Sequence, residues 1–203
     1  MKKEEKTELT KEKILNAAII EFGTKGYEGA SVNNICNDNG ISKGLIYHNF
    51  KSKDEIYLIC VGRCFQTFIA YLQEQNVESD MHQYMELRFE FFSKHPLYAR
   101  IFFESVLQPP KHLMEEIRIL KRDFDEMNLK IYRLELSKLT LRDGVNEQEA
   151  IEYYSMVQNM FHGMFQYEVF QNEDFTTLIN AHEMKLAKIL DLMIYGIAKE
   201  ERK

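Results

Sequence analysis

The sequence predicts an all-α protein, and three observations support this fold class. The 203 residues contain only nine Gly and three Pro, too few for the many turns of an all-β protein. Apolar residues recur at intervals of three and four in one segment after another, as on the buried face of a helix. Residues that cap helices stand before several of these segments, so both the faces and the starts of helices are marked.

The N-terminal third of the chain predicts four helices, three of them short. Polar residues suited to capping stand at or before their starts, namely Thr10, Ser31, Ser42 and Ser52. Gly40 is suited to a left-handed residue that ends the second helix, and Ser52 with Glu55 fits a capping box. We therefore expect helices over residues 10–25, 32–39, 43–50 and 53–75.

The second and third of these helices are joined by a tight turn, which is the layout of a helix-turn-helix. In that motif the second helix lies in the major groove of DNA. On this helix we expect an apolar side, formed by Leu45, Ile46 and Phe50, to pack on the neighbouring helices. The opposite side is expected to face DNA and carries Lys43, Gly44, Tyr47 and His48, with Lys53 nearby.

A different interpretation of the same helix pair is a module that binds another protein. The chain has a net charge of −6, which does not by itself favour DNA. Residues 1–60, however, carry as many basic as acidic residues, so the acidic excess lies entirely in residues 61–203. A neutral segment can still bind DNA through a few well-placed contacts, because helix ends and groove contacts need no large net charge.

The stretch TKEKILNAAIIEFGTKGYEGASVNNICNDNGISKGLIYHNFKSKDEIY, residues 10–57, resembles the N-terminal domain of TetR-family transcriptional regulators. The resemblance implies an all-helical homodimer with a DNA-binding domain at residues 1–56, whose helix-turn-helix spans about 31–50. It implies a helical ligand-binding and dimerisation domain at residues 57–203. It also implies a repressor that a small apolar or aromatic ligand releases from its operator, although some members of the family activate transcription.

The resemblance also implies partners and contact residues. The partners are double-stranded DNA with a pseudo-palindromic operator, an unknown small molecule, and a second copy bound through the last two helices. Two positions depart mildly from the family pattern, Ile46 and Asn49. By position, the residues expected to contact DNA are Ser31, Ser42, Lys43, Gly44, Tyr47, His48 and Lys53.

The C-terminal part predicts further helices, over residues 81–96, 97–107, 111–139, 147–170 and 176–198. Two of its stretches are rich in aromatic residues, which can line a pocket for an apolar or aromatic ligand. Polar groups such as Arg88 and Glu104 can orient a ligand there. The alternative is a structural role, core packing for the aromatic residues and an exposed or satisfied position for the polar ones, and for any single residue this alternative is preferred. The candidate ligand-binding residues are Phe89, Phe92, Tyr98, Phe102, Phe103, Phe161, His162 and Phe165.

Other classes of function find no support in the sequence. It contains no G-x-S-x-G, no phosphate-binding glycine loop and no C-x-x-C, so we expect neither an enzyme nor a cofactor. The His residues are scattered, and we expect no metal site. No signal peptide or membrane span is expected, and the protein is expected to be cytoplasmic, with its three cysteines reduced.

Overall fold

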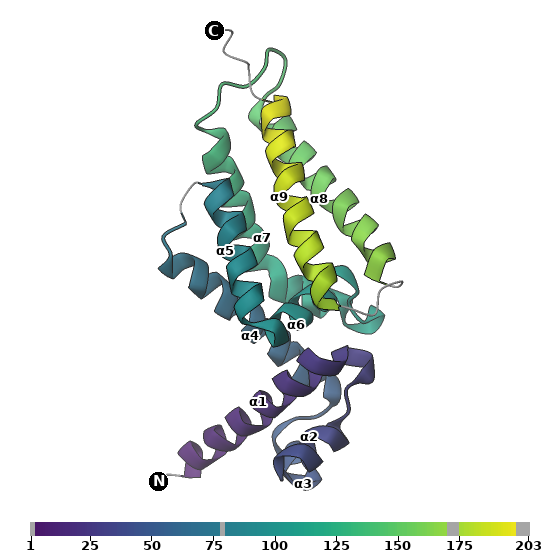
Figure 1. Ribbon diagram of the computed structural model, residues 1–203. Coiled ribbons are helices and arrows are strands. Elements are labelled where there is room, and N and C mark those ends of the chain that lie inside the picture. The colour runs from purple at the N-terminus through teal and green to yellow at the C-terminus, as the bar shows by residue number, and fades with distance from the viewer. Residues whose placement is uncertain (1–2, 78–79, 170–174, 198–203) are drawn as a thin grey trace. The chain divides into compact units, whose positions relative to one another are not determined.

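The computed structural model describes residues 3–77, 80–169 and 175–197, and within these ranges the protein is built from helices without a β-strand (Figure 1). This confirms the predicted all-α class. A single 3₁₀ turn, η1 (Lys111–Leu113), precedes α7. The α-helices are α1 (Lys3–Gly29), α2 (Val32–Asn39), α3 (Lys43–Asn49), α4 (Lys53–Glu74), α5 (Met81–Lys94), α6 (Pro96–Leu107), α7 (Met114–Leu136), α8 (Glu147–Val169) and α9 (Phe175–Ile197).

Most of the predicted helix ends agree with the structure, and those of α1 do not, since it was predicted to end near residue 25 and runs to Gly29 with a kink at Gly26. Thr10 was expected to cap α1, but the helix already begins at Lys3 and Thr10 lies inside it. The charged residues before Thr10 form helices readily, so the cap-like threonine does not stop the helix there. A capping box begins α8, where Asn146 and Glu149 exchange side chain–backbone hydrogen bonds of 2.9 and 3.0 Å.

The chain divides into two compact units, which we describe separately. Unit 1 comprises Met1–Thr67 and His95–Lys121, and unit 2 comprises Phe68–Lys94 and Arg122–Lys203. Helix α6 therefore belongs to the same unit as α1, α2 and α3. The predicted domain boundary after residue 56 stays a prediction.

Unit 1 depends on close packing between α1 and α6. A Cβ atom added at Gly23 would lie 2.7 Å from the Cβ of Leu97 and 2.8 Å from its Cα, so only glycine fits. Three residues later Gly26 adopts φ 70° and kinks the helix. The backbone N–H of Tyr27 is then free of the helical pattern and donates to both carboxylate oxygens of Glu104, at 2.9 and 3.0 Å.

Helix α4 carries two of the three cysteines, Cys60 and Cys64, and all three are buried and free of disulfides. Burial raises the pKa of Cys60 to about 12 and also raises that of Cys64. In the part of the chain that the structure describes, α4 is the one helix long and apolar enough to cross a membrane. Half of its apolar stretch is buried in the protein, as in the core helix of many water-soluble proteins, so this is weak evidence for a span.

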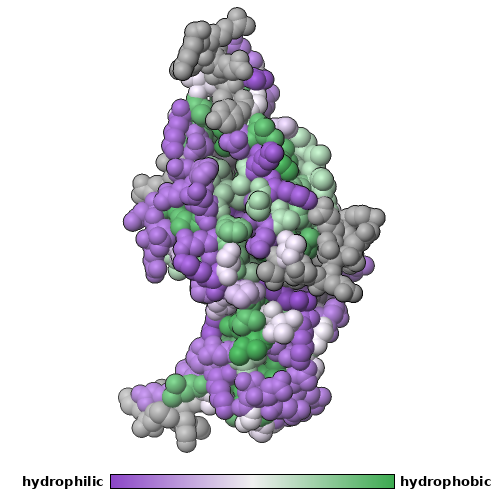
Figure 2. All heavy atoms as spheres, viewed as in Figure 1, coloured by the Kyte–Doolittle hydropathy of each residue, from purple (hydrophilic) through white to green (hydrophobic). Residues whose placement is uncertain are grey.

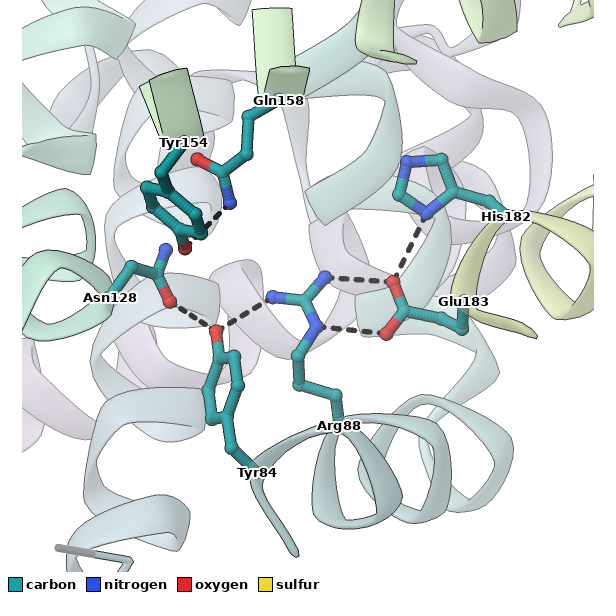
Figure 3. Close-up of polar contacts among 7 residues, drawn as sticks. All are labelled: Tyr84, Arg88, Asn128, Tyr154, Gln158, His182 and Glu183. Atoms are coloured by element: carbon teal, nitrogen blue, oxygen red, sulfur yellow. Dashed lines mark hydrogen bonds and ion pairs between the residues drawn. The ribbon is translucent and has the colours of Figure 1, made fainter. Parts of the chain in front are cut away.

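Unit 2 encloses a buried polar network (Figure 3). Arg88 of α5 is 4% exposed and donates two hydrogen bonds, of 2.7 and 2.8 Å, to the carboxylate of Glu183 in α9. It also donates to the hydroxyl of Tyr84 at 3.1 Å, and that hydroxyl donates to Asn128 of α7. A ring nitrogen of His182 lies 3.2 Å from the Glu183 carboxylate. One charge pair thus joins α5 to α9 inside the core.

The ionisation of Glu183 depends on its partners. Burial alone would raise the pKa of this carboxyl group, but the charge of Arg88 and the hydrogen bonds from His182 and Arg88 lower it to about 2. In an unfolded chain a glutamate titrates near pH 4.3. A depressed pKa in the folded state stabilises the fold above the unfolded value, and this contribution is lost as the pH falls toward 2.

We predict that Gly23→Ala lowers the free energy of unfolding by about 2–3 kcal/mol, because the new methyl group overlaps the backbone of Leu97. Urea denaturation at fixed protein concentration measures this change. Gly44→Ala is the control, since a Cβ atom at Gly44 has no neighbour within 4 Å. Equal stability of the two variants would contradict the close contact between α1 and α6.

We predict that Arg88→Met destabilises the fold by about 3–5 kcal/mol, because it leaves the Glu183 carboxylate buried without its partner. Arg118→Met is a matched control, because Arg118 forms a similar two-bond pair with Glu115 on the surface. That exposed pair should contribute less than about 1 kcal/mol. As the pH falls from about 4.5 to 2, the Glu183→Gln variant should also lose less stability than the wild-type protein loses. Equal losses of stability in Arg88→Met and Arg118→Met would contradict the larger contribution of the buried pair.

Candidate nucleic-acid interface

Helices α2 and α3 form a helix-turn-helix whose ends are fixed by short-range hydrogen bonds. Ser31 caps α2, its hydroxyl accepting the N–H of Asn34 at 3.1 Å, and Ser42 caps α3 by accepting the N–H of Leu45 at 3.2 Å. Between the helices Gly40 adopts the left-handed conformation with φ 59°, as predicted, and a side chain there would be strained. The turn and both caps thus follow from residues within a few positions of one another.

A buried carboxylate joins this motif to α1. Glu21 accepts the backbone N–H of Ser31 at 3.0 Å and the side-chain amide of Asn34 at 2.8 Å, and it pairs with Lys25 at 2.8 Å. Although burial opposes its ionisation, the hydrogen bonds from Lys25, Asn34 and Ser31 lower the pKa of Glu21. The charged carboxylate therefore sits at the N-terminus of α2, where the helix dipole favours a negative charge.

Most of α3 is open to solvent. Lys43, Gly44 and His48 are exposed, and the Tyr47 side chain is 49% exposed. Ile46 is fully buried and, with Phe50 just after the helix, attaches α3 to its neighbours. The predicted polar side of the helix is therefore the free side. At Gly44 an added Cβ would meet no neighbouring atom within 4 Å, so the space beside the helix is open there.

Leu45 is a correction to the sequence analysis. It was assigned to the apolar side that packs inward, but 40% of its surface is exposed. Helix geometry explains the error, because Ile46 and Phe50 are four residues apart and share a face. Leu45 instead stands three residues before His48, on the polar side. The exposed face of α3 thus combines donor groups with one branched apolar side chain.

Lys53, at the start of α4, is held near this surface by Tyr27. Its ammonium group lies 4.3 Å from the centre of the Tyr27 ring, within the range of a cation–π interaction. The Tyr27 hydroxyl donates to Asp54 and lies 3.2 Å from His112. Burial, together with Asp54, raises the pKa of Tyr27, so the hydroxyl keeps its proton. A half-buried lysine is thereby positioned by a fixed aromatic ring.

The predicted ligand-binding residues fall into both units. Tyr98, Phe102 and Phe103 belong to unit 1, where Phe102 and Phe103 are buried in contact with each other. In unit 2, Phe92, Phe161 and Phe165 are buried, His162 is half-buried, and Phe89 is 41% exposed and lines a groove. Their role in ligand binding stays a prediction. Sequence reasoning did not find Glu183, the partner of Arg88.

A protein family and two curated relatives resemble parts of this chain. Residues 14–59 match the family described as bacterial regulatory proteins, tetR family. The biofilm operon icaADBC HTH-type negative transcriptional regulator IcaR of Staphylococcus epidermidis is 30% identical over 124 residues, covering 56% of this chain and 65% of the relative. The match thus spans slightly less than two thirds of that relative's length. IcaR of Staphylococcus aureus strain Newman is 27% identical over 142 residues, covering 67% and 76% of the two chains.

Solved structures share the fold over nearly the whole chain. A transcriptional regulator of Aquifex aeolicus VF5 superimposes with a TM-score of 0.59 at 24% identity, covering 91% of this chain and 99% of that one. The regulator FadR of Bacillus subtilis, solved in complex with stearoyl-CoA, gives a TM-score of 0.62 at 18% identity, covering 91% and 98%. The helix-turn-helix thus lies in a segment that matches the tetR family of bacterial regulatory proteins, and the solved structures show that the chain shares their fold.

Proposed function

We propose that this protein is a cytoplasmic DNA-binding transcriptional regulator that represses its target until a small molecule releases it. The observation that carries the proposal is the exposed face of α3. This face presents hydrogen-bond donors beside Gly44, where no side chain covers the helix backbone. The curated relatives from Staphylococcus are negative transcriptional regulators, which supports repression here.

Each residue on the face of α3 suits a particular contact with DNA. The ammonium group of Lys43 and the hydroxyl of Tyr47 can donate to phosphates or to base edges. Gly44 allows the DNA backbone or a thymine methyl group to approach the helix closely. Leu45 supplies the apolar contact that a thymine methyl group favours, and His48 adds a further polar group. Ser31, Ser42 and Lys53 remain proposed contacts at the edges of this surface.

We infer a homodimer formed through α8 and α9. Helix α8 exposes large apolar residues at intervals of three and four, which form one stripe. Leu192 of α9 is 61% exposed and lines one hollow together with Tyr153 of α8, so the exposed faces of the two helices adjoin. A second copy would cover this surface by twofold symmetry. The stripe, called the α8 stripe below, consists of Tyr153, Met156, Met160 and Met164.

Release by a ligand follows from the geometry of a dimer on DNA. Two recognition helices bind adjacent major grooves when they lie about 34–36 Å apart. A ligand that binds better to a dimer with a different spacing shifts the population away from DNA. FadR of Bacillus subtilis, which shares this fold, was solved with stearoyl-CoA bound, so the fold can hold a small molecule.

We predict saturable binding to DNA from the region upstream of the protein's own gene, measured by fluorescence anisotropy. Unlabelled specific DNA should compete, and affinity should fall steeply as salt rises, because counterions return to the phosphates. Binding that is absent, or that is no stronger than to random DNA, would contradict an operator in this region. A protein partner that binds α3 with little dependence on salt would instead favour the interaction module.

We predict that Lys43→Ala and Tyr47→Ala each weaken operator binding by about tenfold or more. Gly44→Ala is the sharper test, because the added methyl group meets nothing in the free protein and should not destabilise it. A loss of affinity in this variant would therefore report the close approach of DNA. Lys130→Ala, at an exposed lysine of α7, is the control and should bind normally. Normal affinity in all three α3 variants would exclude this face.

We predict that Met160→Glu converts the dimer into a monomer, because twofold symmetry places two carboxylates in an apolar interface. Light scattering after gel filtration measures the mass. Ile119→Glu is the matched control, since Ile119 of α7 is similarly exposed but lies outside the α8 stripe. A Met160→Glu protein that remains dimeric at the wild-type dissociation constant would place the interface elsewhere.

A further inference from the structure

Unit 2 contains a groove that the DNA-binding surface does not use. It lies among α5, the C-terminal end of α7 with the residues just after it, and α9, and its volume is about 650 Å³. Pockets for small molecules generally measure about 300–1,000 Å³, so an organic molecule of moderate size fits. On the face drawn in Figure 2, hydrophobic residues of unit 2 are bordered by hydrophilic ones.

The wall of this groove is apolar and adaptable. Phe89 and Met184 are substantially exposed within it, at 41% and 67%. An exposed phenylalanine and an exposed methionine that line one hollow favour an apolar occupant, because covering them removes hydrophobic surface from water. Methionine side chains adjust readily to the shape of a ligand. The apolar lining consists of Met81, Met85, Phe89, Leu139, Met184, Ala187 and Ile194.

Carboxylates supply nearly all the charge of the groove. Two of them already have a cationic partner, since Glu183 is paired with Arg88 and Glu135 lies 3.2 Å from Lys138. Glu86 of α5 and Asp191 of α9 are exposed and line the groove, and a ring nitrogen of His82 lies 3.5 Å from the Glu86 carboxylate. Asp80 lines the groove as well and caps α5 by accepting the N–H groups of His82 and Gln83.

Basic groups are scarce along the same lining. No lysine or arginine lines the groove in the described part of the chain, and His82 is the one side chain there that can become cationic. Arg88 is engaged by Glu183. A carboxylate or phosphate ligand would therefore meet like charges, with no lysine or arginine of the described lining to pair with. A positive ligand would be attracted, because carboxylates around an apolar hollow concentrate a negative potential there.

We propose that this groove binds lipophilic organic cations: molecules with an apolar body that covers Phe89 and Met184 and one positive charge near Glu86 and Asp191. The same geometry excludes fatty acids and their coenzyme A thioesters, which carry negative charge. The role of such a cation as the releasing ligand rests on the proposed function, whereas the binding itself rests on the groove alone.

Tetraphenylphosphonium and tetraphenylborate test the proposal directly, because the two ions match closely in shape and size and carry opposite charges. Isothermal titration calorimetry of the full-length protein without DNA should show one phosphonium ion bound per chain and the borate bound at least about tenfold more weakly. Equal or stronger binding of the borate would overturn the proposal, and so would the absence of phosphonium binding.

Variants then locate the site. Glu86→Gln combined with Asp191→Asn should weaken phosphonium binding by about tenfold, since both carboxylates are exposed and their loss should not disturb the fold. Phe89→Ser should weaken it through the lost apolar contact. Asp123→Asn with Glu126→Gln, which neutralises two exposed carboxylates of α7 outside the groove, is the control. Unchanged affinity in the groove variants would overturn the assignment.

A separate assay distinguishes this inference from the proposed function. Anisotropy with operator DNA shows whether the protein binds DNA, and the calorimetry above uses no DNA. Phosphonium binding that is sensitive to the groove variants supports the site even if operator binding fails. Operator binding without any phosphonium binding overturns the site and leaves the DNA-binding function intact.

Discussion

The surface that α3 offers depends on the ionised carboxylate of Glu21. This one group accepts hydrogen bonds from the start of α2 and is paired with a lysine one turn further along α1. Helix α2 is thereby held against α1, and the tight turn at Gly40 leaves α3 little freedom of its own. A helix of only seven residues is not stable by itself in water, so its orientation is set by these neighbours.

The end of α1 is fixed by a second carboxylate, that of Glu104 in α6. Gly23 allows α1 to approach α6 closely, and the kink at Gly26 turns a backbone N–H toward Glu104. The Tyr57 hydroxyl of α4 lies 3.3 Å from the same carboxylate. Three helices of unit 1 therefore meet at one acidic side chain. Gly23 and Gly26 thus serve to join α1 to α6.

The features that the sequence predicted correctly are local ones. The caps at Ser31 and Ser42 and the left-handed Gly40 involve residues at most a few positions apart, and the structure has all of them. Leu45 was misplaced because apolar character alone does not tell which side of a short helix faces inward. The pair of Arg88 and Glu183 joins residues 95 positions apart, and no spacing in the sequence signals it. Aromatic content likewise did not distinguish core residues from groove residues, because aromatic side chains line both protein cores and apolar grooves.

The burial of the two thiols of α4 lowers their reactivity toward reagents in solution. Only the thiolate form reacts with alkylating agents and oxidants, and burial that raises the pKa of Cys60 to about 12 leaves almost none of it at neutral pH. The thiols of Cys60 and Cys64 should therefore react very slowly with peroxide while α4 stays packed. They become reactive when α4 unfolds locally, so the rate of thiol alkylation measures how often α4 unfolds. The protein thus carries its own reporter of local unfolding, without any label being introduced.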